Sequence, residues 1–139
     1  MRRVRAFLDT NVLVSAFLFK GNENQVLRRG VRGEFKPLCS EYVLGEFERV
    51  LRDKLGIPRD QISLWMEVVV EACEIVEALK EHNIEFLDDK DRLVVNAAID
   101  GGAEFLVTGD HHLLKAVFEG LRIVTARKFL EILESSSGK

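Results

Sequence analysis

Short, almost continuously apolar runs alternate with longer amphipathic segments along the chain, and this alternation restricts the possible folds more than any other feature. The clearest apolar runs are residues 4–8, 105–107 and 121–124, and each leads through turn or cap residues into a helical pattern. Nearly continuous apolar strands that alternate with helices are typical of a parallel sheet covered by helices on both faces. The sequence therefore predicts a three-layer α/β/α fold.

The expected strands and helices follow one another from residue 4 to residue 133. The expected strands are residues 4–8, 35–39, 73–78, 105–107 and 121–124. The expected helices begin near residues 10, 23, 40, 58, 92, 111 and 126, where cap or turn residues precede a helical spacing of apolar side chains. Pro37 weakens the second strand because proline cannot donate a ladder hydrogen bond, and residues 73–78 could instead prolong the helix before them.

One domain accounts for the chain. Its 139 residues are 47% hydrophobic and 31% charged, which is ordinary globular composition, and no repeat or Pro/Gly-rich linker divides them. Residues 1–134 are expected to form the domain, and residues 135–139 a flexible tail. Cys39 and Cys73 belong to no CxxC motif and are interpreted as reduced core residues.

The apolar run at the N-terminus ends too early for a signal peptide. Asp9 and Asn11 interrupt it, and no other apolar stretch of the sequence is long enough to cross a bilayer. We therefore expect a cytoplasmic protein without membrane contact.

The net charge of −3 argues against a protein whose whole surface attracts nucleic acid. Local attraction is still possible, because several arginines are clustered in two segments. The candidate nucleic-acid-binding residues are Arg28, Arg29, Arg32, Arg49 and Arg52. The alternative interpretation of each cluster is a solvated surface of mixed charge.

Two of the expected strands are followed by aspartates that would share one edge of the sheet. Asp9 follows residues 4–8, and Asp110 follows residues 105–107 within Thr108-Gly109-Asp110. The carboxyl ends of parallel strands meet at one edge, where open α/β sheets bind their ligands. Asp91 joins the other two if its helix also starts at that edge. Each aspartate could alternatively serve only as a helix N-cap.

Three converging carboxylates repel one another and are costly to bury unless they have partners. A bound cation is the natural partner, and ligands that are all oxygen favour Mg²⁺ or Mn²⁺ over zinc. Cysteine and histidine in metal-ligand spacing are absent from the sequence.

The order and spacing of four segments resemble the PIN-domain family, and within it the small prokaryotic toxin components of toxin–antitoxin pairs, the VapC-like toxins. These segments are residues 7–12 (Phe-Leu-Asp-Thr-Asn-Val), 43–47 (Val-Leu-Gly-Glu-Phe), 88–91 (Asp-Asp-Lys-Asp) and 106–110 (Leu-Val-Thr-Gly-Asp). The resemblance implies about five parallel strands and an acidic pocket that binds Mg²⁺ or Mn²⁺ to hydrolyse RNA phosphodiester bonds. It also implies a homodimer, an RNA substrate and a small antitoxin partner.

The resemblance places the catalytic and metal-binding acids on four positions of this sequence. These positions are Asp9, Glu46, Asp91 and Asp110. A further acid falls on Asp88, and polar residues near the metal fall on Asn11 and Thr108. Glu46 rests on the resemblance alone, because residues 41, 46 and 48 are all glutamates of one expected helix.

The hypothesis for the mechanism uses one or two cations to activate water and stabilise the leaving oxygen. Asp9 would be the central ligand, and Asp91 and Asp110 would hold the metal. Glu46 would complete the coordination or position water. Thr108 and Asn11 would orient these groups through their hydroxyl and amide.

Three other functions are compatible with acids at the edge of a parallel sheet. A nuclease-derived module could bind metal and nucleic acid without turnover. A phosphoryl-receiver signalling domain would need an acidic pair at the first turn and a lysine after the last strand. The first turn here is Asp9-Thr10-Asn11, and the nearest late lysine, Lys128, falls in an expected helix. A haloacid-dehalogenase-like phosphatase would need a second aspartate at the position of Asn11.

Overall fold

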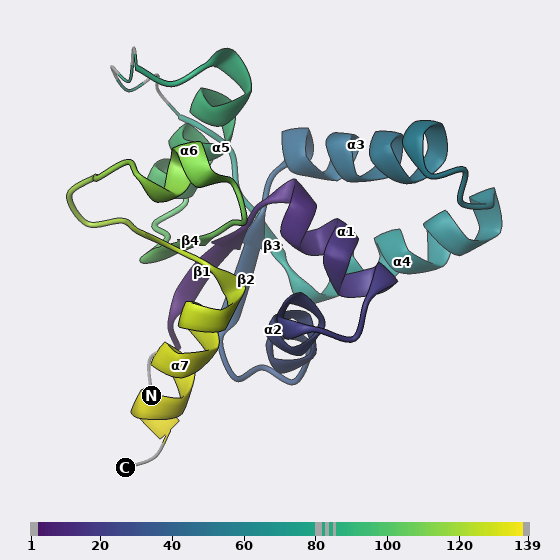
Figure 1. The fold of residues 1–139 in the computed structure, drawn as a ribbon, viewed down its shortest axis with the longest axis horizontal. Coiled ribbons are helices and arrows are strands. Elements are labelled where there is room, and N and C mark those ends of the chain that lie inside the picture. The colour runs from purple at the N-terminus through teal and green to yellow at the C-terminus, as the bar shows by residue number, and fades with distance from the viewer. Residues whose placement is uncertain (1–2, 80–81, 83, 85, 138–139) are drawn as a thin grey trace.

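Five parallel strands form one sheet in the order β3-β2-β1-β4-β5, with helices flanking it (Figure 1). The computed structural model describes residues 3–79, 82, 84 and 86–137. The strands are β1 (Arg5–Leu8), β2 (Lys36–Cys39), β3 (Glu74–Ile75), β4 (Phe105–Val107) and β5 (Arg122–Val124). The predicted α/β fold with about five parallel strands is confirmed.

Seven α-helices lie in the described ranges, and one of them continues into a π-helical turn. The helices are α1 (Thr10–Leu18), α2 (Asn22–Val31), α3 (Glu41–Arg49), α4 (Arg59–Ala72), α5 (Asp89–Asp100), α6 (His111–Leu114) and α7 (Ala126–Ser137), and the turn is η1 (Val50–Lys54). Within the described part of the chain, no helix is long and apolar enough to span a membrane.

Two helix ends differ from the sequence expectation. The helix expected from residue 40 to about 55 loses its α-helical spacing in η1, where the Leu55 N–H donates to the Val50 carbonyl, five residues earlier. At the other end of the chain, α7 continues through Ser137, three residues into the expected tail. Residues 138–139, the rest of that tail, lie outside the described residues.

Strand β1 is the central strand and determines where the first aspartate lies. It pairs with β2 on one side and β4 on the other, with Phe7 opposite both Leu38 and Leu106. The Asp9 N–H extends the second ladder by donating to the Val107 carbonyl at 3.1 Å. Asp9 is thereby fixed at the carboxyl edge, beside the end of β4.

Gly101, the C-cap residue directly after α5, lies against Val76 with no room for a side chain. A Cβ atom built on Gly101 would lie 2.6 Å from Val76 Cγ2 and 2.7 Å from Val76 Cβ. The Gly101 carbonyl also accepts a 2.7 Å hydrogen bond from Arg5 Nη2, and Arg5 forms an ion pair with Glu74. These contacts join the end of α5 to β1 and β3.

Gly101→Ala is expected to lower the free energy of unfolding by about 1–3 kcal/mol, the usual cost of overpacking. Val76→Ala in the same chain removes Cγ2, the atom nearest to the new methyl group, so the double variant should lose less than the sum of the two single variants. Urea denaturation of all three proteins measures this coupling. Strictly additive losses would show that the two residues do not collide.

Gly45→Ala is the control for the general effect of replacing a helical glycine. A Cβ on Gly45, an exposed residue of α3, would meet nothing within 4 Å. This variant should be more stable than the parent by about 1 kcal/mol, because alanine has the higher helix propensity.

Candidate active site

A cavity of about 270 Å³ lies at the carboxyl edge of the sheet, and all four predicted acids line it: Asp9, Glu46, Asp91 and Asp110. They come from the ends of β1 and β4 and from helices α3 and α5. Figure 1 shows the N-terminal ends of α1 and α3 beside the upper ends of the central strands. The other lining residues are Thr10, Asn11, Val14, Ser15, Tyr42, Val50, Lys90 and Val94.

Asp9 is a helix cap and a wall of the cavity at the same time. Its Oδ1 accepts a 2.8 Å hydrogen bond from the Thr10 N–H at the start of α1. Its Oδ2 accepts a 2.7 Å hydrogen bond from the hydroxyl of Thr108. Burial raises the pKa of Asp9 and the charge of Asp110 adds to this, while the bonds from Thr108 and Thr10 oppose the rise.

Thr108 joins the two strand-end aspartates. While its hydroxyl donates to Asp9, its Oγ1 accepts a 3.0 Å hydrogen bond from the Asp110 N–H. Asp110 Oδ1 in turn accepts from the His112 N–H at 2.7 Å and caps α6. Thr108 is 1% exposed and does not line the cavity, so it supports the aspartates from behind.

Asp91 lies in the first turn of α5, close to the other acids of the cavity. Burial, followed by the negative charges of Asp88, Asp110 and Asp9, raises the pKa of Asp91 to about 6. Asp88 Oδ1 accepts a 2.9 Å hydrogen bond from the Asp91 N–H and caps the helix. The acids of the cavity are thus close enough to repel one another.

Glu46 faces the same cavity and is held by a cation. Arg49 Nε and Nη2 donate to Glu46 Oε1 and Oε2 at 3.2 and 2.8 Å. This two-pronged hydrogen bond lowers the pKa of Glu46 and keeps it ionised.

A sequence profile of the PIN domain matches residues 5–112 of the chain. The chain belongs to the PIN-domain family. The resemblance seen in the sequence is thereby confirmed. Members of this family are generally nucleases and typically require divalent metal ions. No curated protein sequence gives a significant match to the chain.

Solved structures with the same fold agree with this assignment. A chain of the VapBC2 structure from Rickettsia felis, bound to a promoter DNA fragment, matches with a TM-score of 0.63 and 18% identity, over 86% of this chain and 97% of that chain. PAE2754 from Pyrobaculum aerophilum matches with a TM-score of 0.67 and 18% identity, over 95% of this chain and 90% of that chain. At this identity the likeness shows the fold.

The cavity of this PIN domain fits a divalent cation in donor type and in charge. It offers carboxylate oxygens from Asp9, Asp91 and Asp110, which Mg²⁺ and Mn²⁺ prefer, and the repulsion among them is what a cation relieves. Among the residues described, no three His, Cys, Asp or Glu side chains already stand in a ligating arrangement. The carboxylate of Glu46 is occupied by Arg49.

The two supporting residues and Asp88 take different places. Asn11 is exposed and lines the acidic cavity. Thr108 does not line the cavity and acts on it only through Asp9 and Asp110. Asp88 lies outside this cavity and lines an adjoining one.

Sequence reasoning missed four polar residues of the cavity: Thr10, Ser15, Tyr42 and Lys90. Helical spacing is the signal that could have found two of them. Ser15 follows Asn11 by four positions on α1, and Tyr42 precedes Glu46 by four on α3, so each pair shares one helix face. Burial, followed by the charge of Glu46, raises the pKa of Tyr42.

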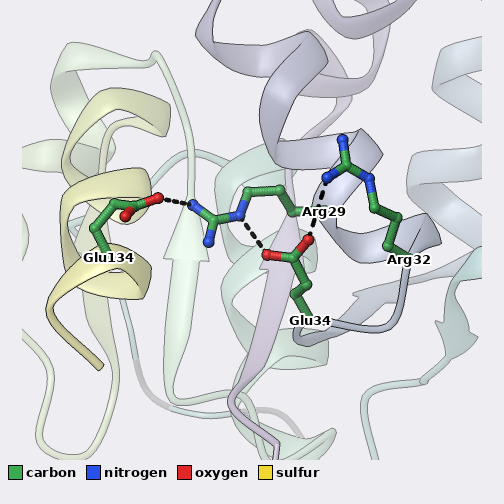
Figure 2. Close-up of polar contacts among 4 residues, drawn as sticks. All are labelled: Arg29, Arg32, Glu34 and Glu134. Atoms are coloured by element: carbon green, nitrogen blue, oxygen red, sulfur yellow. Dashed lines mark hydrogen bonds and ion pairs between the residues drawn. The ribbon is translucent and has the colours of Figure 1, made fainter. Parts of the chain in front are cut away.

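Arg29 and Arg32 lie at the opposite edge of the sheet from the cavity. Arg29 donates to Glu34 at 2.7 Å and to Glu134 at 2.9 Å, and Arg32 pairs with the other oxygen of Glu34 (Figure 2). Glu34 precedes β2, so this cluster lies near the amino ends of the strands. The side chain of Arg29 is only 16% exposed, and its ion pairs join α2 to α7. The structure therefore does not bring these two arginines to the acids.

The remaining candidate arginines differ in where they lie relative to the acidic cavity. Arg28, also on α2, donates to Asn24 at 2.9 Å and stays away from the acids. Arg49 contacts the acidic cavity through Glu46. Arg52 pairs with Asp53 in η1, the turn that also contributes a lining residue, Val50.

Asp91→Asn is expected to raise the melting temperature of the metal-free PIN domain at pH 7.5. The folded-state pKa of Asp91, about 6, lies above the value of about 4 for an unfolded aspartate. The protonated Asp91 side chain therefore contributes its full stability below the unfolded pKa, and this contribution is lost as the pH rises through the folded pKa. At pH 7.5 Asp91 is ionised and repelled by its neighbours, and asparagine removes that charge. Thermal unfolding in EDTA at pH 7.5 and pH 4.5 measures the effect, which should shrink at the lower pH.

Asp89→Asn is the matched control for Asp91→Asn. Asp89 lies in the same first turn of α5, but its side chain is 88% exposed and does not line the cavity. The control removes the same favourable interaction with the helix N-terminus, together with an exposed ion pair to Arg92, without relieving repulsion in the cavity. Equal decreases in melting temperature for both variants at pH 7.5 would contradict the repulsion.

Proposed function

We propose that this PIN domain is an endoribonuclease that uses Mg²⁺ or Mn²⁺ to hydrolyse RNA phosphodiester bonds. One observation carries the proposal: Asp9, Glu46, Asp91 and Asp110 line a single cavity at the carboxyl edge of the sheet. The nuclease character of the family supports the reaction class. RNA as the substrate rests on the resemblance to VapC-like toxins.

In this proposal Asp9, Asp91 and Asp110 hold the cation, and Glu46 joins them when its carboxylate leaves Arg49. A divalent cation bound there would supply Lewis-acid activation of water and neutralise charge at the phosphate. Thr108 keeps the Asp9 carboxylate in one orientation. Lys90 lines the same cavity and provides a positive charge for a non-bridging phosphate oxygen.

Calorimetric titration with Mn²⁺, run beside a cleavage assay on single-stranded and structured RNA, tests the proposal. Saturable Mn²⁺ binding together with cleavage that EDTA abolishes is the expected result. Mn²⁺ and RNA binding without cleavage would instead establish a binding module without turnover. Failure to bind Mn²⁺ at millimolar concentration would overturn the proposed metal site.

We further propose that the protein is the toxin of a toxin–antitoxin pair and acts as a homodimer with a small antitoxin partner. The similarity to a chain of the VapBC2 structure supports this role. Expression in a bacterial host should arrest growth, whereas expression of Asp110→Asn should not. Unimpaired growth with the soluble, RNA-cleaving parent protein would argue against the toxin role.

A phosphoryl receiver is disfavoured by the family assignment and by Lys128, which lies in α7 and pairs with Glu131.

A further inference from the structure

A second cavity, of about 390 Å³, adjoins the acidic one, and the proposed reaction does not use it. Its lining residues are Phe86, Leu87, Asp88, Asp91, His112 and Lys115. Asp91 of α5 lines both cavities, so the two adjoin at this side chain. A ligand that extends from the acids past Asp91 would enter this second cavity.

An exposed aromatic ring forms one wall of the second cavity. The Phe86 ring stacks on Phe118, with centroids 6.0 Å apart and planes inclined by 21°. Phe86 nevertheless remains 70% exposed, whereas most phenylalanines of the chain lie in the core. A ring that is supported by a neighbour and largely exposed to water is suited to stacking with a nucleobase.

Two basic side chains, Lys115 and His112, line the same cavity. Lys115 is exposed and has no ion-pair partner in the described part of the chain, and His112 lies three positions earlier, on α6. Asp88 and Asp91 make the side shared with the first cavity acidic. A phosphate in the second cavity is therefore attracted towards Lys115 and His112 and repelled from the shared side.

We propose that the second cavity, here called the flanking-nucleotide site, binds an unpaired nucleotide next to the scissile phosphate of single-stranded RNA. Its base stacks on Phe86, and its phosphate contacts Lys115 and His112. The proposal rests on the proposed function and deepens it by naming the residues that would hold the substrate beside the cleaved bond. A duplex does not fit this role, because its bases are already stacked and paired and cannot reach the ring.

Binding of a fluorescein-labelled single-stranded RNA, measured by anisotropy with Mn²⁺ in the Asp110→Asn background to prevent cleavage, tests the site. Adding Phe86→Ala should raise the Kd about tenfold, equivalent to about 1.4 kcal/mol, which is within the range for base stacking on an aromatic side chain. Adding Lys115→Gln should weaken binding several-fold and reduce the salt dependence by about one phosphate contact. The corresponding duplex RNA should bind more weakly and be insensitive to Phe86→Ala.

Two exposed residues outside both cavities provide matched controls. Val117→Ala truncates an apolar side chain that is 90% exposed, and Lys128→Gln removes a positive charge on α7. Both should leave the Kd within about twofold of the parent, and melting temperatures should show that all variants are folded. Equal weakening by Val117→Ala and Phe86→Ala would show that the aromatic ring has no specific part in binding.

A cleavage assay in the otherwise unaltered protein separates failure of this site from failure of the proposed function. Phe86→Ala should raise KM for single-stranded RNA and leave kcat within about twofold of the parent, because the ring lies outside the acidic cavity. RNA cleavage with unchanged Kd and KM in Phe86→Ala and Lys115→Gln would overturn the site alone. RNA binding weakened by Phe86→Ala without any cleavage by the parent would overturn turnover alone, and no RNA binding at all would overturn both.

Discussion

Asp9→Asn should lower Mn²⁺-dependent RNA cleavage by about 10³-fold while the protein remains folded. A catalytic cation contributes several kcal/mol to transition-state stabilisation, and a loss of about 4 kcal/mol corresponds to about three powers of ten in rate. The asparagine oxygen can still accept from the Thr10 N–H at the start of α1, and the Thr108 hydroxyl can rotate to accept from the new amide. Initial rates at matched Mn²⁺ concentrations, with circular dichroism and melting temperature, measure both parts.

Asp60→Asn is the control for Asp9→Asn. Asp60 is an exposed acid in the first turn of α4 and does not line the acidic cavity. It should retain the activity of the parent. Full activity of Asp9→Asn at the same metal concentration would refute the assignment of Asp9 as the central ligand.

Thr108→Val should lower cleavage by about 10–100-fold, the usual effect of removing a group that orients a metal ligand. Valine has nearly the same shape but cannot donate to Asp9 or accept from the Asp110 N–H. The loss leaves polar groups unpaired in a buried site and should cost about 1–3 kcal/mol of stability. Cleavage rates and urea denaturation measure the two effects.

Thr108→Ser separates the role of the hydroxyl from that of the methyl group. Serine keeps the hydroxyl, so its activity should lie within a few-fold of the parent even if stability falls slightly. A serine variant as impaired as the valine variant would show that packing at this position, and not the hydrogen bonds, supports the site.

The sequence was sufficient to predict most of the fold because most strands are largely apolar and are followed by a recognisable cap. Ser40 illustrates this: its side chain accepts from the Val43 N–H where the third predicted helix begins. The exception is β3, where only Glu74–Ile75 of the expected strand 73–78 forms a strand. The π-helical turn η1 was not predictable, since a change from four-residue to five-residue hydrogen bonding leaves the apolar pattern almost unaltered.

Sequence reasoning located the acids unequally well. Asp9 and Asp110 follow from strand ends, because the topology of a parallel sheet places those ends together. Glu46 could not be separated from Glu41 and Glu48 by any local pattern, and only the fold shows that Glu46 alone of the three lines the cavity. The arginines were harder, because sequence clustering does not reveal which guanidinium groups are already paired, as in the contacts of Arg29.

The central position of β1 also determines how the site responds to local unfolding. Amide hydrogens of β1 are bonded within the middle of the sheet, whereas β3 is a two-residue strand at its edge. Local opening starts where few bonds hold the backbone, so hydrogen exchange should be fast in β3 and slowest in β1. The backbone beneath Asp9 therefore stays in place while the edge of the sheet opens and closes.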